Sequence, residues 1–147
     1  MNLFVLFQFM IGNTDWWIHT RHNVDLVQTT HFGLIPVPYD FDYSGIINTP
    51  YATPANNLPI SQVKTRFIKN YCHNAEAYSD AIDRFNQQKT AILTIFEEAE
   101  VLDKKHKKSS VKYIEDFYEI INDPVQFGRY LDESCEFVNT IPNEAPK

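Results

Sequence analysis

The chain has 147 residues, which is enough for one domain with a hydrophobic core. Its formal net charge of −6 and its pI near 5.3 exclude the basic footprint of a nucleic-acid-binding protein, so we expect no nucleic-acid partner. The longest apolar run, residues 3–11, is too short to span a bilayer and lacks the marks of a signal peptide. We therefore expect no membrane span, and the compartment stays open.

The first elements lead into a polar stretch. Residues 3–10 predict a buried helix that ends at Gly12-Asn13, a typical stop signal. Residues 13–22 predict a loop, residues 23–28 alternate as a strand does, and residues 34–39 predict the returning strand. Pro36 and Pro38 confine that second strand to a sheet edge. Residues 40–59 contain three prolines and predict a long ordered loop.

The region from residue 60 to residue 138 is predicted to be helical. Apolar stripes at helical spacing indicate helices over 61–71, over 75–99, from an N-cap at Asp103 to Ile121, and over 125–131. Residues 139–147 predict a flexible tail. The expected fold class is mainly α with a small β-hairpin, in a single domain spanning residues 1–138 with its site region at 12–45.

The two cysteines, Cys72 and Cys135, have no metal-ligand spacing. They form either a disulfide, as in an oxidising compartment, or two free buried thiols. The sequence leaves both alternatives open.

The first 60 positions are poor in positive charge: Arg21 is their only Lys or Arg, against the acids Asp15, Asp25, Asp40 and Asp42. Such a stretch is typical of a solvated loop or of a cation site. The open end of the predicted hairpin would bring Asn23 near Asp40. Carboxylate and amide oxygens suit a hard cation, so we expect Mg²⁺, or Mn²⁺, bound by Asn23, Asp40 and Asp42.

The order of these residues resembles the catalytic and metal-binding loops of kinase-like folds. The strings Phe-Gln-Phe-Met-Ile-Gly-Asn-Thr-Asp-Trp and Val-Pro-Tyr-Asp-Phe-Asp-Tyr-Ser-Gly also resemble an uncharacterised family of Bacteroidetes proteins, in which this region lies toward the C-terminal end of a longer chain. The kinase resemblance covers about residues 3 to 45. It implies the C-terminal lobe of a kinase-like phosphotransferase.

The resemblance also implies a role for each residue. Asp15 matches the catalytic aspartate that orients the acceptor hydroxyl, and Asn23 and Asp40 match the metal-binding asparagine and aspartate. Asp42 stands where the glycine of Asp-Phe-Gly would be, as in atypical kinases of the spore-coat-protein-H type. The phosphoryl acceptor is not implied.

Two features depart from the usual kinase pattern. Asp15 and Asn23 lie eight positions apart instead of five, so either the extra residues bulge out or another residue takes the place of Asp15. The four glycines form no phosphate-covering loop, and only 14 residues precede Asp15. We therefore expect ATP to bind only with a missing N-terminal lobe or a second chain, and the isolated chain to be inactive.

Two other function classes stay open. A metal-dependent hydrolase would use Asp15, His19, His22 and Asp40, with His31 as a further imidazole, and would prefer Zn²⁺. A non-catalytic relic or interaction module would keep only the shape of the lobe. In that case Asp15 is a turn cap.

Overall fold

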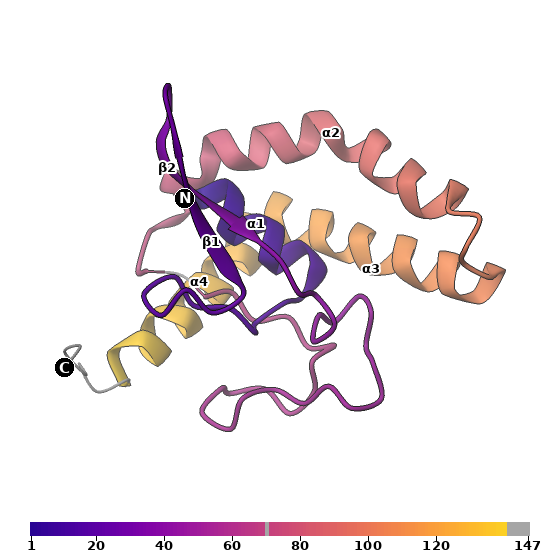
Figure 1. The fold of residues 1–147 in the computed structure, drawn as a ribbon, viewed down its shortest axis with the longest axis horizontal. Coiled ribbons are helices and arrows are strands. Elements are labelled where there is room, and N and C mark those ends of the chain that lie inside the picture. Colours follow the sequence, from indigo (N-terminus) through magenta and orange to yellow (C-terminus); the bar gives the residue numbers. More distant parts are fainter. Residues whose placement is uncertain (70, 141–147) are drawn as a thin grey trace.

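The computed structural model describes residues 1–69 and 71–140, with side chains as far as residue 137. Within these residues the chain forms four α-helices, one 3₁₀ helix and one two-stranded antiparallel hairpin (Figure 1). The predicted class, mainly α with a small β-hairpin, is confirmed. In chain order the elements are α1 (Asn2–Ile11), β1 (Val24–Thr29), β2 (Gly33–Pro38), η1 (Ala75–Tyr78), α2 (Ser79–Glu98), α3 (Lys104–Asn122) and α4 (Pro124–Thr140).

Helix α1 lies at the centre of the core, with seven of its ten residues buried. It ends at Gly12, as predicted, because Gly12 adopts the left-handed conformation (φ 66°). A side chain there would also collide with the Tyr113 hydroxyl. The amide of Asn13 then donates to the Gln8 carbonyl at 2.8 Å. The chain therefore leaves the buried helix in one defined direction, toward Asp15.

Helices α2 and α3 lie side by side and cover α1 (Figure 1). Aromatic rings join them, with Phe117 of α3 lying 5.4 Å from Phe85 of α2 and 6.0 Å from Phe9 of α1 between ring centroids. The predicted N-cap is confirmed, since the Asp103 carboxylate accepts from the His106 amide at 2.8 Å. Because that cap sets the start, α3 begins at Lys104, ahead of the apolar stripe that starts at Val111.

The prediction of a helix over residues 61–71 is wrong. Residues 60–73, here called the strap, contain no helix or strand among their described positions. Arg66, Phe67 and Ile68 are all buried, although consecutive side chains of a surface helix diverge too widely for that. The Arg66 guanidinium donates to the carbonyls of Phe9, Met10 and Tyr113. The irregular backbone of the strap lets Arg66 donate hydrogen bonds to carbonyls at the end of α1, while Phe67 packs on Phe137 of α4.

Helix α4 is longer than the predicted 125–131. It runs through Thr140, two residues into the predicted tail, and residues 141–147 lie outside the described residues. Cys135 of α4 forms a disulfide with Cys72 of the strap, at a Cα–Cα distance of 4.7 Å. Of the two alternatives for the cysteines, the structure therefore contains the disulfide, which attaches the strap to α4.

The hairpin projects from the helical body (Figure 1). Its register runs from Val24 opposite Pro38 to Thr29 opposite Gly33, close to the predicted strands. Val24 is buried at the base, whereas Val27, Ile35 and Val37 share one face and are 36–44% exposed. None of the described helices is long and apolar enough to cross a membrane.

Candidate functional site

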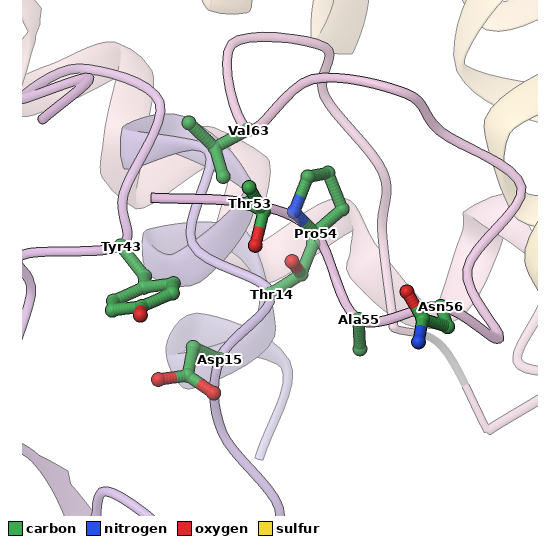
Figure 2. A pocket seen from close by; sticks show the side chains of 8 residues that line it. All are labelled: Thr14, Asp15, Tyr43, Thr53, Pro54, Ala55, Asn56 and Val63. Atoms are coloured by element: carbon green, nitrogen blue, oxygen red, sulfur yellow. The ribbon is translucent and has the colours of Figure 1, made fainter. Parts of the chain in front are cut away.

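Asp15 lies beside an open cavity of about 310 Å³ (Figure 2). Thr14 and Asp15 approach it from the loop after α1, and Tyr43 approaches from the turn after the hairpin. Residues 53–56 of the proline-rich loop form the opposite wall, with Val63 of the strap. Among the described residues of the lining, Asp15 alone is charged, so this part of the cavity is polar without being basic.

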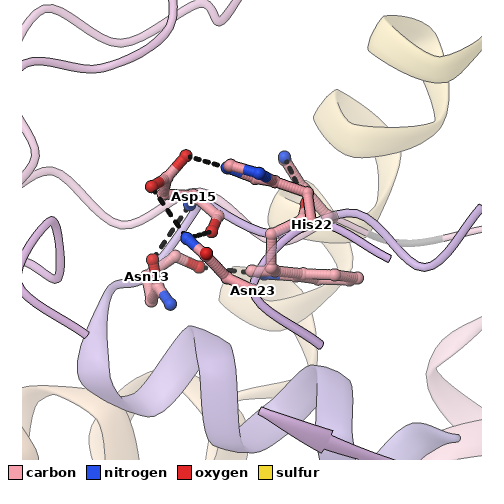
Figure 3. A network of polar contacts seen from close by, with 6 residues as sticks. Asn13, Asp15, His22 and Asn23 are labelled. Carbon is pink, nitrogen blue, oxygen red and sulfur yellow. Dashed lines mark hydrogen bonds and ion pairs between the residues drawn. The ribbon is translucent and has the colours of Figure 1, made fainter. Parts of the chain in front are cut away.

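Asp15 is also the centre of a polar network with Asn13, His22 and Asn23 (Figure 3). Its amide donates to Asn13 Oδ1 at 2.9 Å, and its carboxylate Oδ1 lies 2.9 Å from His22 Nε2. Asn23 Nδ2 donates both to the Asp15 carbonyl at 2.8 Å and to Asp15 Oδ2 at 3.0 Å. The carboxylate is therefore oriented by two side chains that lie seven and eight positions further along the chain.

The eight-residue spacing of Asp15 and Asn23 has a simple structural cause. Trp17 and His22 form a β-bridge with two backbone hydrogen bonds, of 3.0 and 2.9 Å. This bridge closes residues 18–21 into a small loop, with Arg21 in the left-handed conformation. Asp15 and Asn23 therefore meet although residues 18–21 loop out between them.

Asn23 and Asp40 both lie at the open end of the hairpin, one before the first strand and one after the second. Asn23 precedes β1, Asp40 follows β2 by two residues, and the Tyr39 amide donates to the Asn23 carbonyl at 3.1 Å. Both residues have positive φ angles, 53° and 58°, in the region that Asn and Asp tolerate best after glycine. Strained backbone of this kind gathers at functional sites, so this pair is a candidate for function.

Asp40 and Asp42 lie close enough together for a side-chain hydrogen bond. Strand β2 ends at Pro38, and the chain turns at Asp40, which has a positive φ angle. The Phe41 ring packs against α1, with its centroid 5.8 Å from the centroid of the Phe7 ring. A hydrogen bond with Asp42 and its like charge raise the pKa of Asp40, and desolvation and the charge of Asp15 add to this while His22 opposes it.

Sequence reasoning missed the residues that hold Asp42. Tyr51 donates to Asp42 Oδ2 at 3.1 Å, a bond that raises the pKa of Tyr51, and Thr49 Oγ1 donates to the Asp42 carbonyl at 3.0 Å. Both belong to the loop that the sequence predicted to be ordered. The hydroxyl-bearing side chains of that loop, seven and nine positions after Asp42, were the signal in the sequence that could have indicated these contacts.

Lys69 of the strap was also missed. Its ammonium donates to the Trp16 carbonyl at 2.9 Å and lies 5.6 and 5.1 Å from the ring centroids of Trp16 and Trp17. Desolvation lowers its pKa to about 8, although the charge of Asp15 opposes the shift. Lys69 therefore fixes the backbone next to Asp15, and no sequence pattern links two residues 53 positions apart.

The remaining histidines do not join Asp15 in the same way. The His19 ring lies 6.0 Å from the Trp17 ring and 6.2 Å from the Tyr71 ring, and His31 lies beside Phe32 in the hairpin turn. Across residues 1–69 and 71–140, no group of three or more His, Cys, Asp or Glu side chains is arranged to hold a metal ion. A ligand set drawn from these residue types alone is therefore not assembled here.

Comparison of the chain with protein-family models, with curated proteins and with solved structures finds no significant match.

Proposed function

We propose that the chain is the metal-binding lobe of a kinase-like phosphotransferase. The observation that supports this best is that the Asp15–Asn23 pair and the Asp40–Asp42 pair come from two loops joined by the hairpin, near enough for the charge of Asp15 to raise the pKa of Asp40. Phosphoryl transfer needs positioned oxygen ligands and charge neutralisation more than covalent help from the protein. These four side chains supply groups of that kind.

The donor set is compatible with Mg²⁺ held jointly by protein and phosphates. Mg²⁺ is usually bound by one or two carboxylates, with waters and substrate phosphates completing its shell, so three acidic ligands are not required. Asp40 and Asp42 are two adjacent carboxylates, and their mutual repulsion is what a cation would relieve. Asn23 directs its amide nitrogen to Asp15, which leaves its amide oxygen as the ligand atom. The metal would neutralise charge on the transferred phosphoryl group.

Asp15 would orient the acceptor hydroxyl. Its carboxylate is fixed by His22 and Asn23, and its backbone by Asn13 and, through Trp16, by Lys69. Orientation of this kind converts binding into reactive geometry, which is the main catalytic contribution in this reaction class. Asp15 also borders the cavity of Figure 2, which would place a second substrate beside this residue.

The nucleotide would be gripped mainly by a second lobe or a second chain. The four glycines form no phosphate-covering loop, so we expect the 147-residue chain to bind ATP weakly or not at all. The exposed face formed by Val27, Ile35 and Val37 gives such a partner an apolar surface next to Asn23. Low-micromolar affinity of the chain for Mg²⁺–ATP in calorimetry would contradict this part of the proposal.

Metal preference tests the reaction class. Binding of Mn²⁺ is measured by the loss of the paramagnetic resonance signal of the free ion. Mg²⁺ should displace the bound Mn²⁺. In His22→Ala, the Mg²⁺ concentration needed for this displacement should stay within about threefold of the wild-type value. A Zn²⁺ site that is lost in His22→Ala would instead identify a hydrolase. Absence of binding by all three ions would leave only an interaction module.

A further inference from the structure

The cavity beside Asp15 presents groups that match alcohols. Thr14, Tyr43 and Thr53 contribute hydroxyls, and Asn56 contributes a carboxamide (Figure 2). A hydroxyl both donates and accepts hydrogen bonds, and a carboxamide offers one group of each kind. Pro54 and Val63 add apolar wall between them. A ligand with several hydroxyls can form hydrogen bonds with these hydroxyl and carboxamide groups.

The same lining disfavours anions. The lining residues within 1–69 and 71–140 include no Lys, Arg or His, and Asp15 places a negative charge at the edge of the cavity. Phosphates and carboxylates are recognised by cationic donors or by clusters of backbone amides, and an anion here would face Asp15 without a counter-charge. The cavity is therefore unsuited to the phosphates of a nucleotide. It is suited to a neutral or cationic ligand.

The volume limits the size of that ligand. About 310 Å³ lies at the small end of the range for ligand cavities, roughly 300–1,000 Å³. Recognition of an extended peptide usually requires a strand edge or a series of side-chain pockets, whereas this is one open concave space bounded on one side by residues 53–56. A compact molecule of about monosaccharide size fits these limits best.

We propose that this cavity binds the phosphoryl acceptor, and that the acceptor is a small, neutral or cationic polyhydroxylated molecule. The inference rests on the proposed function, because it takes Asp15 as the residue that orients the acceptor. The acceptor oxygen forms a bond to the γ-phosphorus of a nucleoside triphosphate while the bond from that phosphorus to the diphosphate oxygen breaks. The hydroxyl proton passes to Asp15 and then to water, and the products are a phosphate ester and the nucleoside diphosphate.

Three hexoses of one shape and different charge test the proposal. Saturation-transfer NMR on the 147-residue chain compares glucose, glucosamine and glucuronate. We expect signals from glucose and glucosamine, and at least about fivefold weaker binding of glucuronate. Thr53→Val and Asn56→Ala should each weaken glucose binding about fivefold, the effect of one lost hydrogen bond. Thr90→Val, on the exposed part of α2, is the matched control and should change nothing.

Three results would overturn the inference: equal binding of glucuronate, binding that is unchanged in both cavity variants, or silence of all three hexoses while the peptide acetyl-Ala-Ser-Ala-amide binds. Mn²⁺ titration of the same samples separates this failure from failure of the proposed function. Metal binding without hexose binding refutes the cavity assignment alone. Hexose binding without metal binding supports the cavity as a ligand site and refutes phosphoryl transfer.

Discussion

One nitrogen of Asn23 holds two oxygens of Asp15, the backbone carbonyl at 2.8 Å and the carboxylate Oδ2 at 3.0 Å. Asn23 makes both bonds from a left-handed backbone, with φ 53°, immediately before β1. The pair connects the loop after α1 to the base of the hairpin. Asn23 therefore orients Asp15, and under the proposed function its amide oxygen would also be a ligand for a cation.

Replacement of Asn23 should separate the backbone contribution from the side-chain contribution. Asn23→Ala loses both donated bonds and keeps a left-handed backbone that alanine disfavours, so the free energy of unfolding should fall by about 2 kcal/mol. Asn23→Gly loses the same bonds without the backbone penalty and should fall by about 1 kcal/mol. Urea denaturation of the purified variants measures both values.

Asn48 provides the matched control, because it has φ 51° and lies outside the Asp15 network. Asn48→Ala should be destabilising by about 1 kcal/mol and Asn48→Gly should be nearly neutral. Equal effects of glycine at positions 23 and 48 would show that the two hydrogen bonds of Asn23 contribute nothing to stability.

Because of Lys69, the free energy of unfolding should increase with pH in mildly alkaline solution. Its pKa of about 8 in the folded state lies below 10.5, its ordinary value, so the unfolded chain binds more protons between these pH values. The free energy of unfolding should therefore increase from pH 8 toward 10.5, by up to about 3 kcal/mol. Denaturation between pH 7 and 9.5 measures the rise, below the range in which buried Tyr78, with its raised pKa, works in the opposite direction.

Lys69→Met isolates this contribution, because the thioether fills similar space without a titrating group. We expect the difference in unfolding free energy between wild type and variant to depend on pH. Its slope against pH should correspond to the binding of at most one proton. Lys89→Met, on the exposed surface of α2, should run parallel to wild type. If the wild-type and Lys69→Met curves are parallel, Lys69 keeps its ordinary pKa and the desolvation account is wrong.

The disulfide between Cys72 and Cys135 should contribute strongly to stability. It joins residues 63 positions apart, and closing a loop of that length in the unfolded chain corresponds to about 4 kcal/mol. Urea denaturation with and without dithiothreitol should show a loss of that order on reduction. The Cys72→Ser, Cys135→Ser double variant should match the reduced protein and ignore the reductant; a wild-type protein that also ignores it would contain no such bond.

Local signals predicted most of the fold because they act over a few residues. Gly12 ends α1 through its own backbone conformation, and Asp103 caps α3 through an amide three residues away. The strap could not be predicted in this way. Arg66 is held by carbonyls 47 to 57 positions distant, so its apolar neighbours mimic a helical stripe while tertiary contacts keep the chain irregular.

The candidate site shows the same division. Residue type and order were sufficient to bring Asp15, Asn23, Asp40 and Asp42 into consideration, because the hairpin that joins them is a local element. The positive φ angle of Asp40 was not predicted, because nothing local in the sequence marks this aspartate as the residue at which the chain turns. Tyr51 and Lys69 reach the site from segments whose positions depend on the whole core.

Titration with Mn²⁺, followed by the paramagnetic resonance of the free ion, tests the proposed metal site most directly. Wild-type chain should bind one ion, Asp40→Asn should abolish binding, and Asp42→Asn should weaken it, because the two carboxylates share the cation. Asp25→Asn, an exposed aspartate of β1, controls for net charge and should bind as wild type does. An Asp40→Asn protein with wild-type affinity would contradict the assignment of the site and the phosphotransferase proposal with it.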